Sequence, residues 1–161
     1  MKKLYVPLSI MTGLLVLDQL PKIWVRSHWP LNQSTVLVPN FLAFTHVENR
    51  GVSFNILGDL SDVIRLPLLI SFSLLAVVML SVYWYRQREQ LSFWMEWAFL
   101  LIIPGATGNL IDRAAQGTVT DFLYFHFYDT SFFVNNLADI LISLGVVAYI
   151  LGTLRPDSPQ A

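Results

Sequence analysis

The sequence predicts a mainly α-helical membrane protein with four transmembrane helices and a small extracytoplasmic β-sheet between the first two. Three observations lead to this fold class. Hydrophobic residues make up 55% of the 161 residues, whereas soluble domains hold roughly 45–50%. They gather into runs close to the about 20 residues that a helix needs to cross a bilayer. Two short β-prone runs follow the first of these. The length fits one domain, which we place at residues 1–161.

Four apolar runs are candidates for membrane helices. They cover about residues 4–24, 66–85, 93–111 and 132–154. The first is similar to a signal peptide, because Lys2 and Lys3 precede a short apolar core. No small-residue cleavage site follows it, and Asp18, Gln19 and Lys22 occupy the positions where one would be needed. We therefore predict an uncleaved first helix.

Basic residues flank these runs in equal numbers on the two sides of the membrane. One side holds Lys2, Lys3, Arg86, Arg88 and Arg155, and the other holds Lys22, Arg26, Arg50, Arg65 and Arg113. The positive-inside rule therefore gives little support to either orientation. The signal-like first run favours cytoplasmic termini, which places loops 31–56 and 112–131 on the outer side.

The first outer loop has the pattern of β-strands. Ser34–Val38 and Leu42–Val47 are β-prone and are separated by Pro39-Asn40. Residues 48–51 are typical of a turn before a third run, Val52–Ile56. We expect a small antiparallel sheet that lies on the membrane.

Composition excludes several classes of function. The net charge of −1 offers no basic face to a nucleic acid. The absence of cysteine removes disulfides, thiolate nucleophiles and thiolate metal ligands. The three histidines, His28, His46 and His126, are far apart, so a zinc protease motif is missing.

Two aspartates lie unusually close to hydrocarbon. Asp139 is near the start of the run 132–154, and Asp121 lies in the aromatic, β-prone stretch Thr118–Phe127. There a period of 2 places Asp121 on one face with apolar neighbours, which predicts partial burial and a raised pKa. A carboxylate beside the bilayer is unfavourable and is therefore interpreted as functional. Asn136 shares a helical face with Asp139 and is a good N-cap residue, whereas we place Asp139 too deep to cap.

Other polar residues form helical pairs. Gly105, Gly108, Asn109 and Asp112 share one face, next to Arg113. The glycines favour a close helix contact, while Asn109 and Arg113 are interpreted as site residues. Asp18 and Lys22 can form an i, i+4 pair, which is more often structural than catalytic. Asn49 and Gly51 are compatible with a simple turn.

Together these motifs resemble the lipoprotein signal peptidases (signal peptidase II), and the similarity spans nearly the whole chain. Gly-Asn-Leu-Ile-Asp-Arg followed by both aspartate motifs is the specific part. In order, the motifs are Asp18-Gln-x-x-Lys22, Asn49-x-Gly51-x-x-Phe54, Gly105-x-x-Gly-Asn-Leu-Ile-Asp-Arg113, Val-x-Asp121-Phe and Asn136-x-Ala-Asp139. The chain departs from the family at Asn135, usually Phe, and at Pro21, commonly a small polar residue.

The resemblance implies a monomeric four-helix aspartic peptidase of the bacterial inner membrane, without metal or cofactor. Such enzymes act among membrane lipids and remove signal peptides from diacylglyceryl-modified prolipoproteins, on the N-terminal side of the lipidated Cys. Asp121 and Asp139 match the catalytic dyad, whose carboxyl groups, about 3 Å apart, would share one proton. The supporting polar set is matched by Asp18, Lys22, Asn49, Gly51, Asn109, Arg113 and Asn136.

Two other functions remain possible from the residues alone. One is a small transporter or assembly subunit in which acids relay protons or cations; the other is an acid-lined metal site. A relay needs acids spread through the membrane depth, whereas a peptidase needs them gathered at one face. The acids here lie at the outer ends of the predicted helices, which favours the peptidase.

Overall fold

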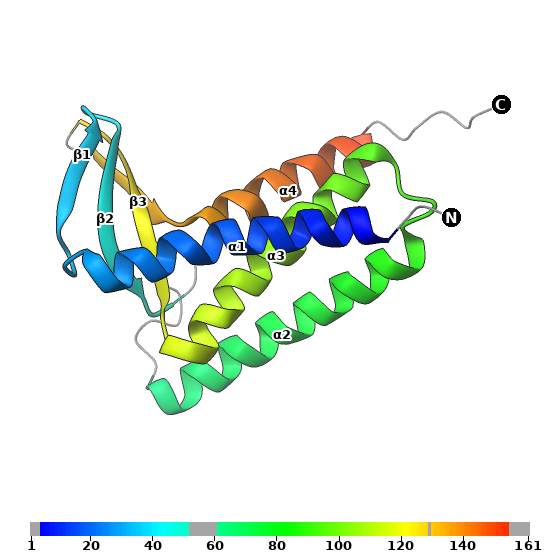
Figure 1. The fold of residues 1–161 in the computed structure, drawn as a ribbon, viewed down its shortest axis with the longest axis horizontal. Helices are drawn as coiled ribbons and strands as arrows, with labels where there is room; N and C mark the ends of the chain where they lie inside the picture. The colour runs from blue at the N-terminus through cyan, green and yellow to red at the C-terminus, as the bar shows by residue number, and fades with distance from the viewer. Residues whose placement is uncertain (1–3, 52–60, 129, 155–161) are drawn as a thin grey trace.

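The computed structural model describes residues 4–51, 61–128 and 130–154. Four helices run beside one another, and a β-sheet lies at one end of them (Figure 1). The start of α1, the α2–α3 turn and the end of α4 lie at the other end (Figure 1). The elements are α1 Tyr5–His28, β1 Ser34–Val38, β2 Leu42–Asn49, α2 Asp62–Gln87, α3 Phe93–Gln116, β3 Val119–Phe127, β4 Thr130–Asn135 and α4 Leu137–Leu154.

Three helices, α1, α2 and α4, are long and apolar enough to cross a membrane. Many large apolar side chains of α2 are exposed, among them Phe72, Leu75 and Met79; a continuous surface of this kind suits contact with lipid. The remaining helix, α3, packs against all three others. Its buried residues include Asn109 and Asp112, so it directs polar groups into the protein interior. The chain is therefore a mainly helical membrane protein.

The sheet is larger than the sequence predicted, and its strands come from two loops. Four antiparallel strands lie in the order β1-β2-β3-β4. The predicted sheet between the first two helices supplies only β1 and β2, because β3 and β4 come from the α3–α4 connection. The turn predicted at residues 48–51 begins later, since β2 continues to Asn49. The predicted run Val52–Ile56 lies outside the described residues.

The prediction that a helix begins at residue 132 was wrong. Residues 132–135 belong to β4, where Phe133 pairs with Phe125 and Val134 with Tyr124, and α4 begins at Leu137. Hydropathy alone cannot separate an apolar strand from the helix that follows it. The other helices are longer than predicted; α1 continues through Pro21 to His28.

Small residues let α3 and α4 approach closely. The predicted shared face of α3 is confirmed, because Gly105, Gly108, Asn109 and Asp112 are all buried. A Cβ atom on Gly105 would lie 2.7 Å from the Ala138 carbonyl oxygen and 3.0 Å from Ile142. Backbone therefore meets backbone at this crossing, which holds the start of α4 against the middle of α3.

Replacing Gly105 by alanine should therefore lower the thermal unfolding midpoint, since overpacking of this kind costs about 1–3 kcal/mol. The matched control is Gly13→Ala in α1, where a Cβ meets nothing within 4 Å. That change should raise stability by up to about 1 kcal/mol, because alanine favours the helix. Thermal unfolding of both variants in one detergent checks this. Equal midpoints for the two variants would contradict the close crossing.

Candidate active site

Asp121 reaches the site because α3 ends sharply and β3 begins at once. Gly117 ends α3 with a φ of 78°, in the left-handed region that favours glycine. Asp121 lies four residues later and is only 1% exposed. The predicted burial of Asp121 is confirmed, and β3 is buried on both faces from Val119 to Phe122. The strand starts between α1 and α3, and it contacts both.

Both carboxylate oxygens of Asp121 accept hydrogen bonds from asparagines. Asn49 Nδ2 donates to Oδ2 at 3.0 Å, and Asn136 Nδ2 donates to Oδ1 at 2.6 Å. Burial raises the pKa of Asp121, and the negative charge of Asp139 raises it further, to about 7; the two hydrogen bonds oppose this shift. Asp121 can therefore hold or release a proton near neutral pH.

Asp139 is held at the first turn of α4 by a reciprocal pair of hydrogen bonds. Its backbone N–H donates to Asn136 Oδ1 at 3.1 Å, and its Oδ2 accepts from the Asn136 backbone N–H at 3.3 Å. This is the geometry of a capping box. Asn136 thus caps the helix as expected, but Asp139 takes part in the cap as well. Asn109 Nδ2 donates to Asp139 Oδ1 at 2.8 Å.

Asn136 contacts both aspartates. Its oxygen accepts from Asp139, its amide nitrogen donates to Asp121, and its side chain is fully buried. The end of β4 and the start of α4 therefore bring a strand carboxylate and a helix carboxylate to one residue. The electrostatic effect of Asp139 on Asp121 is a consequence of this proximity.

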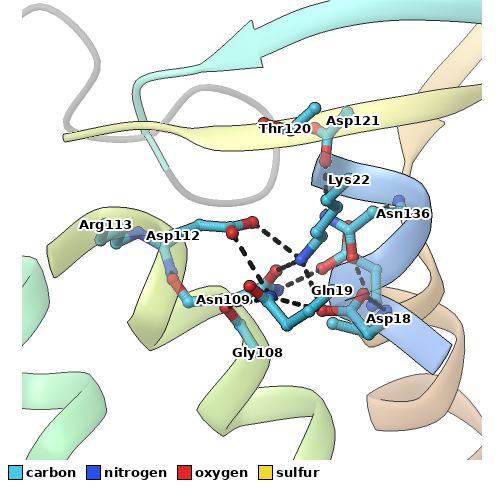
Figure 2. Close-up of polar contacts among 12 residues, drawn as sticks. Asp18, Gln19, Lys22, Gly108, Asn109, Asp112, Arg113, Thr120, Asp121 and Asn136 are labelled. Atoms are coloured by element: carbon cyan, nitrogen blue, oxygen red, sulfur yellow. Dashed lines mark hydrogen bonds and ion pairs between the residues drawn. The ribbon is translucent and has the colours of Figure 1, made fainter. Parts of the chain in front are cut away.

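The buried Lys22 lies below Asp121 in Figure 2. Lys22 Nζ lies 2.8 Å from Asp18 Oδ2 and 2.9 Å from Asp112 Oδ2. It also donates to Asn109 Oδ1 at 3.0 Å. The predicted Asp18–Lys22 pair is thus confirmed, and α3 extends it through Asp112 and Asn109.

Asp18 connects this cluster to α4. Its Oδ1 accepts from the Ala138 backbone N–H at 2.8 Å, one of the helix N-terminal donors that lack an intrahelical partner. A Cβ atom on Gly108 would collide with Asp18 Oδ2. Gly108 is therefore needed for the approach of Asp18 to α3.

Arg113 joins α3 to the segment after β2. Its Nη2 donates to the Gly51 carbonyl oxygen at 3.1 Å, and its Nη1 donates to the Asn109 carbonyl oxygen at 3.4 Å. The Gly51 N–H donates to Asn49 Oδ1 at 3.0 Å. Asn49 and Gly51 do form a turn, but one that directs an amide toward Asp121. All nine predicted site residues therefore lie in one connected network.

Sequence reasoning missed several members of this network, among them Gln19, Arg26, Thr120 and Glu48. Gln19 Nε2 donates to Asp18, to the Gly108 carbonyl and to Asp112. Arg26 Nη1 donates to Thr120 Oγ1 at 3.0 Å, and Thr120 Oγ1 donates to Glu48 Oε1 at 2.9 Å. Arg26 could have been found, because i, i+4, i+8 spacing places it on the helical face of Asp18 and Lys22. Glu48 and Thr120 could not, since their contact depends on strand pairing.

The chain that carries this network matches a known protein family. Residues 10–155 match the family of signal peptidase (SPase) II. The chain belongs to the signal peptidase II family. It is accordingly an aspartic peptidase of the signal peptidase II type, and the resemblance seen in its motifs is confirmed.

Curated relatives of this signal peptidase II chain match along most of their length. The "Lipoprotein signal peptidase" of Streptococcus pneumoniae (strain ATCC BAA-255 / R6) is 34% identical over 157 residues, which cover 98% of this chain and 97% of that protein. The protein of the same name from Bartonella tribocorum (strain CIP 105476 / IBS 506) is 36% identical over 140 residues, covering 86% and 80%.

Solved structures agree with the fold. A bacterial membrane enzyme solved by the in meso method at 2.3 Å resolution superposes with a TM-score of 0.83 at 26% identity, covering 98% of this chain and 93% of that one. A second, at 1.9 Å resolution, gives a TM-score of 0.81 at 27% identity, with 96% of each chain covered. This signal peptidase II chain thus has the fold of solved bacterial membrane enzymes, in agreement with its sequence.

The raised pKa of Asp121 predicts that stability falls as pH rises. The folded protein binds this proton more tightly than the unfolded chain, whose carboxyl titrates near 3.8. The contribution of this proton to the free energy of unfolding is therefore complete below about pH 4 and is lost as the pH rises through about 7. Between pH 5 and pH 8 the free energy of unfolding falls by about 2–3 kcal/mol for this reason.

Asp121→Asn should flatten this slope in thermal unfolding measured across that pH range. Glu89→Gln, which removes an exposed carboxyl group in the α2–α3 turn, is the control and should keep the wild-type slope. If Asp121→Asn also kept the wild-type slope, the raised pKa of Asp121 would be wrong.

Proposed function

We propose that Asp121 and Asp139 are the catalytic dyad with which this chain removes signal peptides from prolipoproteins. The observation that carries the proposal is the contact of both aspartates with Asn136, although Asp121 belongs to β3 and Asp139 to α4. Supporting observations are the burial of Asp121 and its pKa of about 7. Asn49, Asn109 and Asn136 are proposed to orient the carboxylates.

Two carboxyl groups in this arrangement hold one proton between them at neutral pH, because both cannot ionise at close range. The ionised group accepts a proton from a water molecule, whose oxygen attacks the scissile carbonyl carbon. The protonated group donates to the carbonyl oxygen. The tetrahedral intermediate then collapses: the C–N bond breaks, the leaving amine takes the proton that came from water, and a hydroxyl group of the intermediate returns its proton to the carboxylate that had protonated the carbonyl oxygen. This restores the pair to its singly protonated state.

The geometry favours this chemistry over a relay of protons or cations. Asp18, Asp112, Asp121 and Asp139 all belong to one hydrogen-bonded cluster at the end of the helices that carries the sheet. A relay requires acids distributed along a path through the membrane. Here these four acids are gathered at one end of the helices instead.

Asn variants of the dyad test the catalytic assignment. Asp121→Asn and Asp139→Asn should each abolish cleavage, because asparagine keeps the shape of aspartate but cannot exchange the proton. Cleavage of a lipidated prolipoprotein by purified enzyme, followed on a gel with EDTA present, measures this. Glu89→Gln should retain wild-type activity. Unchanged cleavage by either folded Asn variant would remove that residue from the dyad.

The natural substrate is proposed to be a diacylglyceryl-modified prolipoprotein. The exposed apolar faces of the helices can contact acyl chains, and each buried CH₂ contributes about 0.8 kcal/mol. An unlipidated prolipoprotein should therefore be cleaved far more slowly than its lipidated form, with effects on both kcat and KM if lipid burial also positions the scissile bond. Initial rates on both substrates in one detergent test this. Equal rates would mean that the signal peptide alone is recognised.

We further propose an inner-membrane monomer in which α3 also spans the bilayer, both termini are cytoplasmic and the site is near the outer face. The sheet lies at one end of the helices, and the α2–α3 turn lies at the other (Figure 1). The dyad belongs to the sheet end, because Asp121 is in β3 and Asp139 is in the first turn of α4. A cysteine placed at exposed Leu37 in β1 should react in intact spheroplasts with a membrane-impermeant thiol reagent, because this topology puts β1 outside. The labelling is specific, since the chain has no other cysteine. Labelling only after lysis would mean that the protein has the opposite topology.

A further inference from the structure

A cleft lies between α1, α2 and α3, at the end of the molecule remote from the dyad. It has a volume of about 430 Å³, and its lining is almost entirely apolar apart from Arg86. That volume is within the range of sites for small molecules. The lining residues used below are Leu8 and Met11 of α1, Ser81, Tyr85 and Arg86 of α2 and Ile103 of α3. None of them belongs to the active-site network.

Unpaired donors belong to one residue that lines this cleft, Trp84, and to Arg88, which packs on the lining residue Tyr85. Trp84 is 4% exposed, and its buried indole N–H has no hydrogen-bond partner among the described residues. The guanidinium of Arg88 lies 4.6 Å from the centre of the Tyr85 ring, and its buried Nε and Nη1 also lack partners in the part of the chain that the structure describes. Buried polar groups are nearly always paired. A group of unpaired donors beside an apolar cleft therefore calls for a ligand with acceptor oxygens.

The charge of the cleft restricts the ligand further. Within the described part of the chain, neither Arg86 nor Arg88 forms an ion pair with a carboxylate. Two cations beside an apolar cleft between helices suit an anionic headgroup with acyl chains. The n-region of a signal peptide, which is positively charged, would be repelled by them. The substrate is thus a poor occupant of this site.

We propose that this cleft binds one anionic phospholipid. An acyl chain lies against Leu8, Met11 and Ile103, and the phosphodiester accepts hydrogen bonds from Arg86 and Arg88. Such a lipid would hold α1 against α2 at the end of the bundle where neither the sheet nor the Lys22 cluster joins them. The proposal is independent of the peptidase activity, because it concerns affinity for lipid at the opposite end of the molecule.

Native mass spectrometry of the delipidated full-length protein in a non-ionic detergent tests the site. The two probes are dioleoylphosphatidylglycerol, which is anionic, and dioleoylphosphatidylcholine, which has the same chains and no net charge. The first should bind with a 1:1 stoichiometry and at least tenfold more tightly than the second. Arg86→Gln and Arg88→Gln should each weaken binding of the anionic lipid about fivefold and weaken binding of the zwitterionic lipid by a smaller factor, because its phosphodiester is accompanied by a choline cation.

Matched variants separate the site from general effects. Arg50→Gln removes the same charge from an exposed residue in an ion pair with Asp62 and should bind the anionic lipid as the wild type does. Ser81→Phe fills the cleft and should abolish 1:1 binding, whereas Ser71→Phe, elsewhere on α2, should not. Equal affinity for the two lipids would overturn the proposal. So would wild-type affinity in a folded Arg86→Gln, Arg88→Gln double variant.

Discussion

The rest of the site depends on the ion pairs that the buried ammonium group of Lys22 forms. Lys22 is completely buried, and it neutralises Asp18 on its own helix and Asp112 on α3. Removing one partner from a buried ion pair costs about 3–5 kcal/mol, because an uncompensated charge remains in a medium of low dielectric constant. The relative position of α1 and α3 is therefore strongly constrained. Through Asp18 and the Ala138 amide, the start of α4 is constrained as well.

Three asparagines transmit this constraint to the aspartates by a common arrangement. In each one the side-chain oxygen is occupied by a donor: Lys22 for Asn109, the Gly51 amide for Asn49 and the Asp139 amide for Asn136. An amide whose oxygen is held in this way must direct its N–H groups elsewhere. In all three cases they donate to Asp121 or Asp139. Both carboxylates therefore meet preorganised donors, which favours electrostatic control of their charge.

Much of the helical part of the fold could be predicted from the sequence, because long apolar runs have few alternatives. The boundaries at residues 132–137 could not, since Phe132–Val134 suits a strand and a membrane helix equally well. Strand pairing decided the matter, as Phe133 lies opposite Phe125. The sheet was underestimated for the same reason: pairing of β2 with β3 joins segments that are more than 70 residues apart, and no local pattern reports such a contact.

The sequence by itself determined the family and the set of candidate site residues, because acids beside hydrocarbon and the order of the motifs leave few other interpretations. All nine predicted site residues lie in the network, and i, i+4 spacing was sufficient for the Asp18–Lys22 pair. Only the tertiary structure decided how they act on one another. The contacts of Glu48 with Thr120 and of Asn136 with Asp121 join different elements. Likewise, the pKa of Asp121 depends on burial and on a charge from another element, and neither is encoded in its neighbours along the chain.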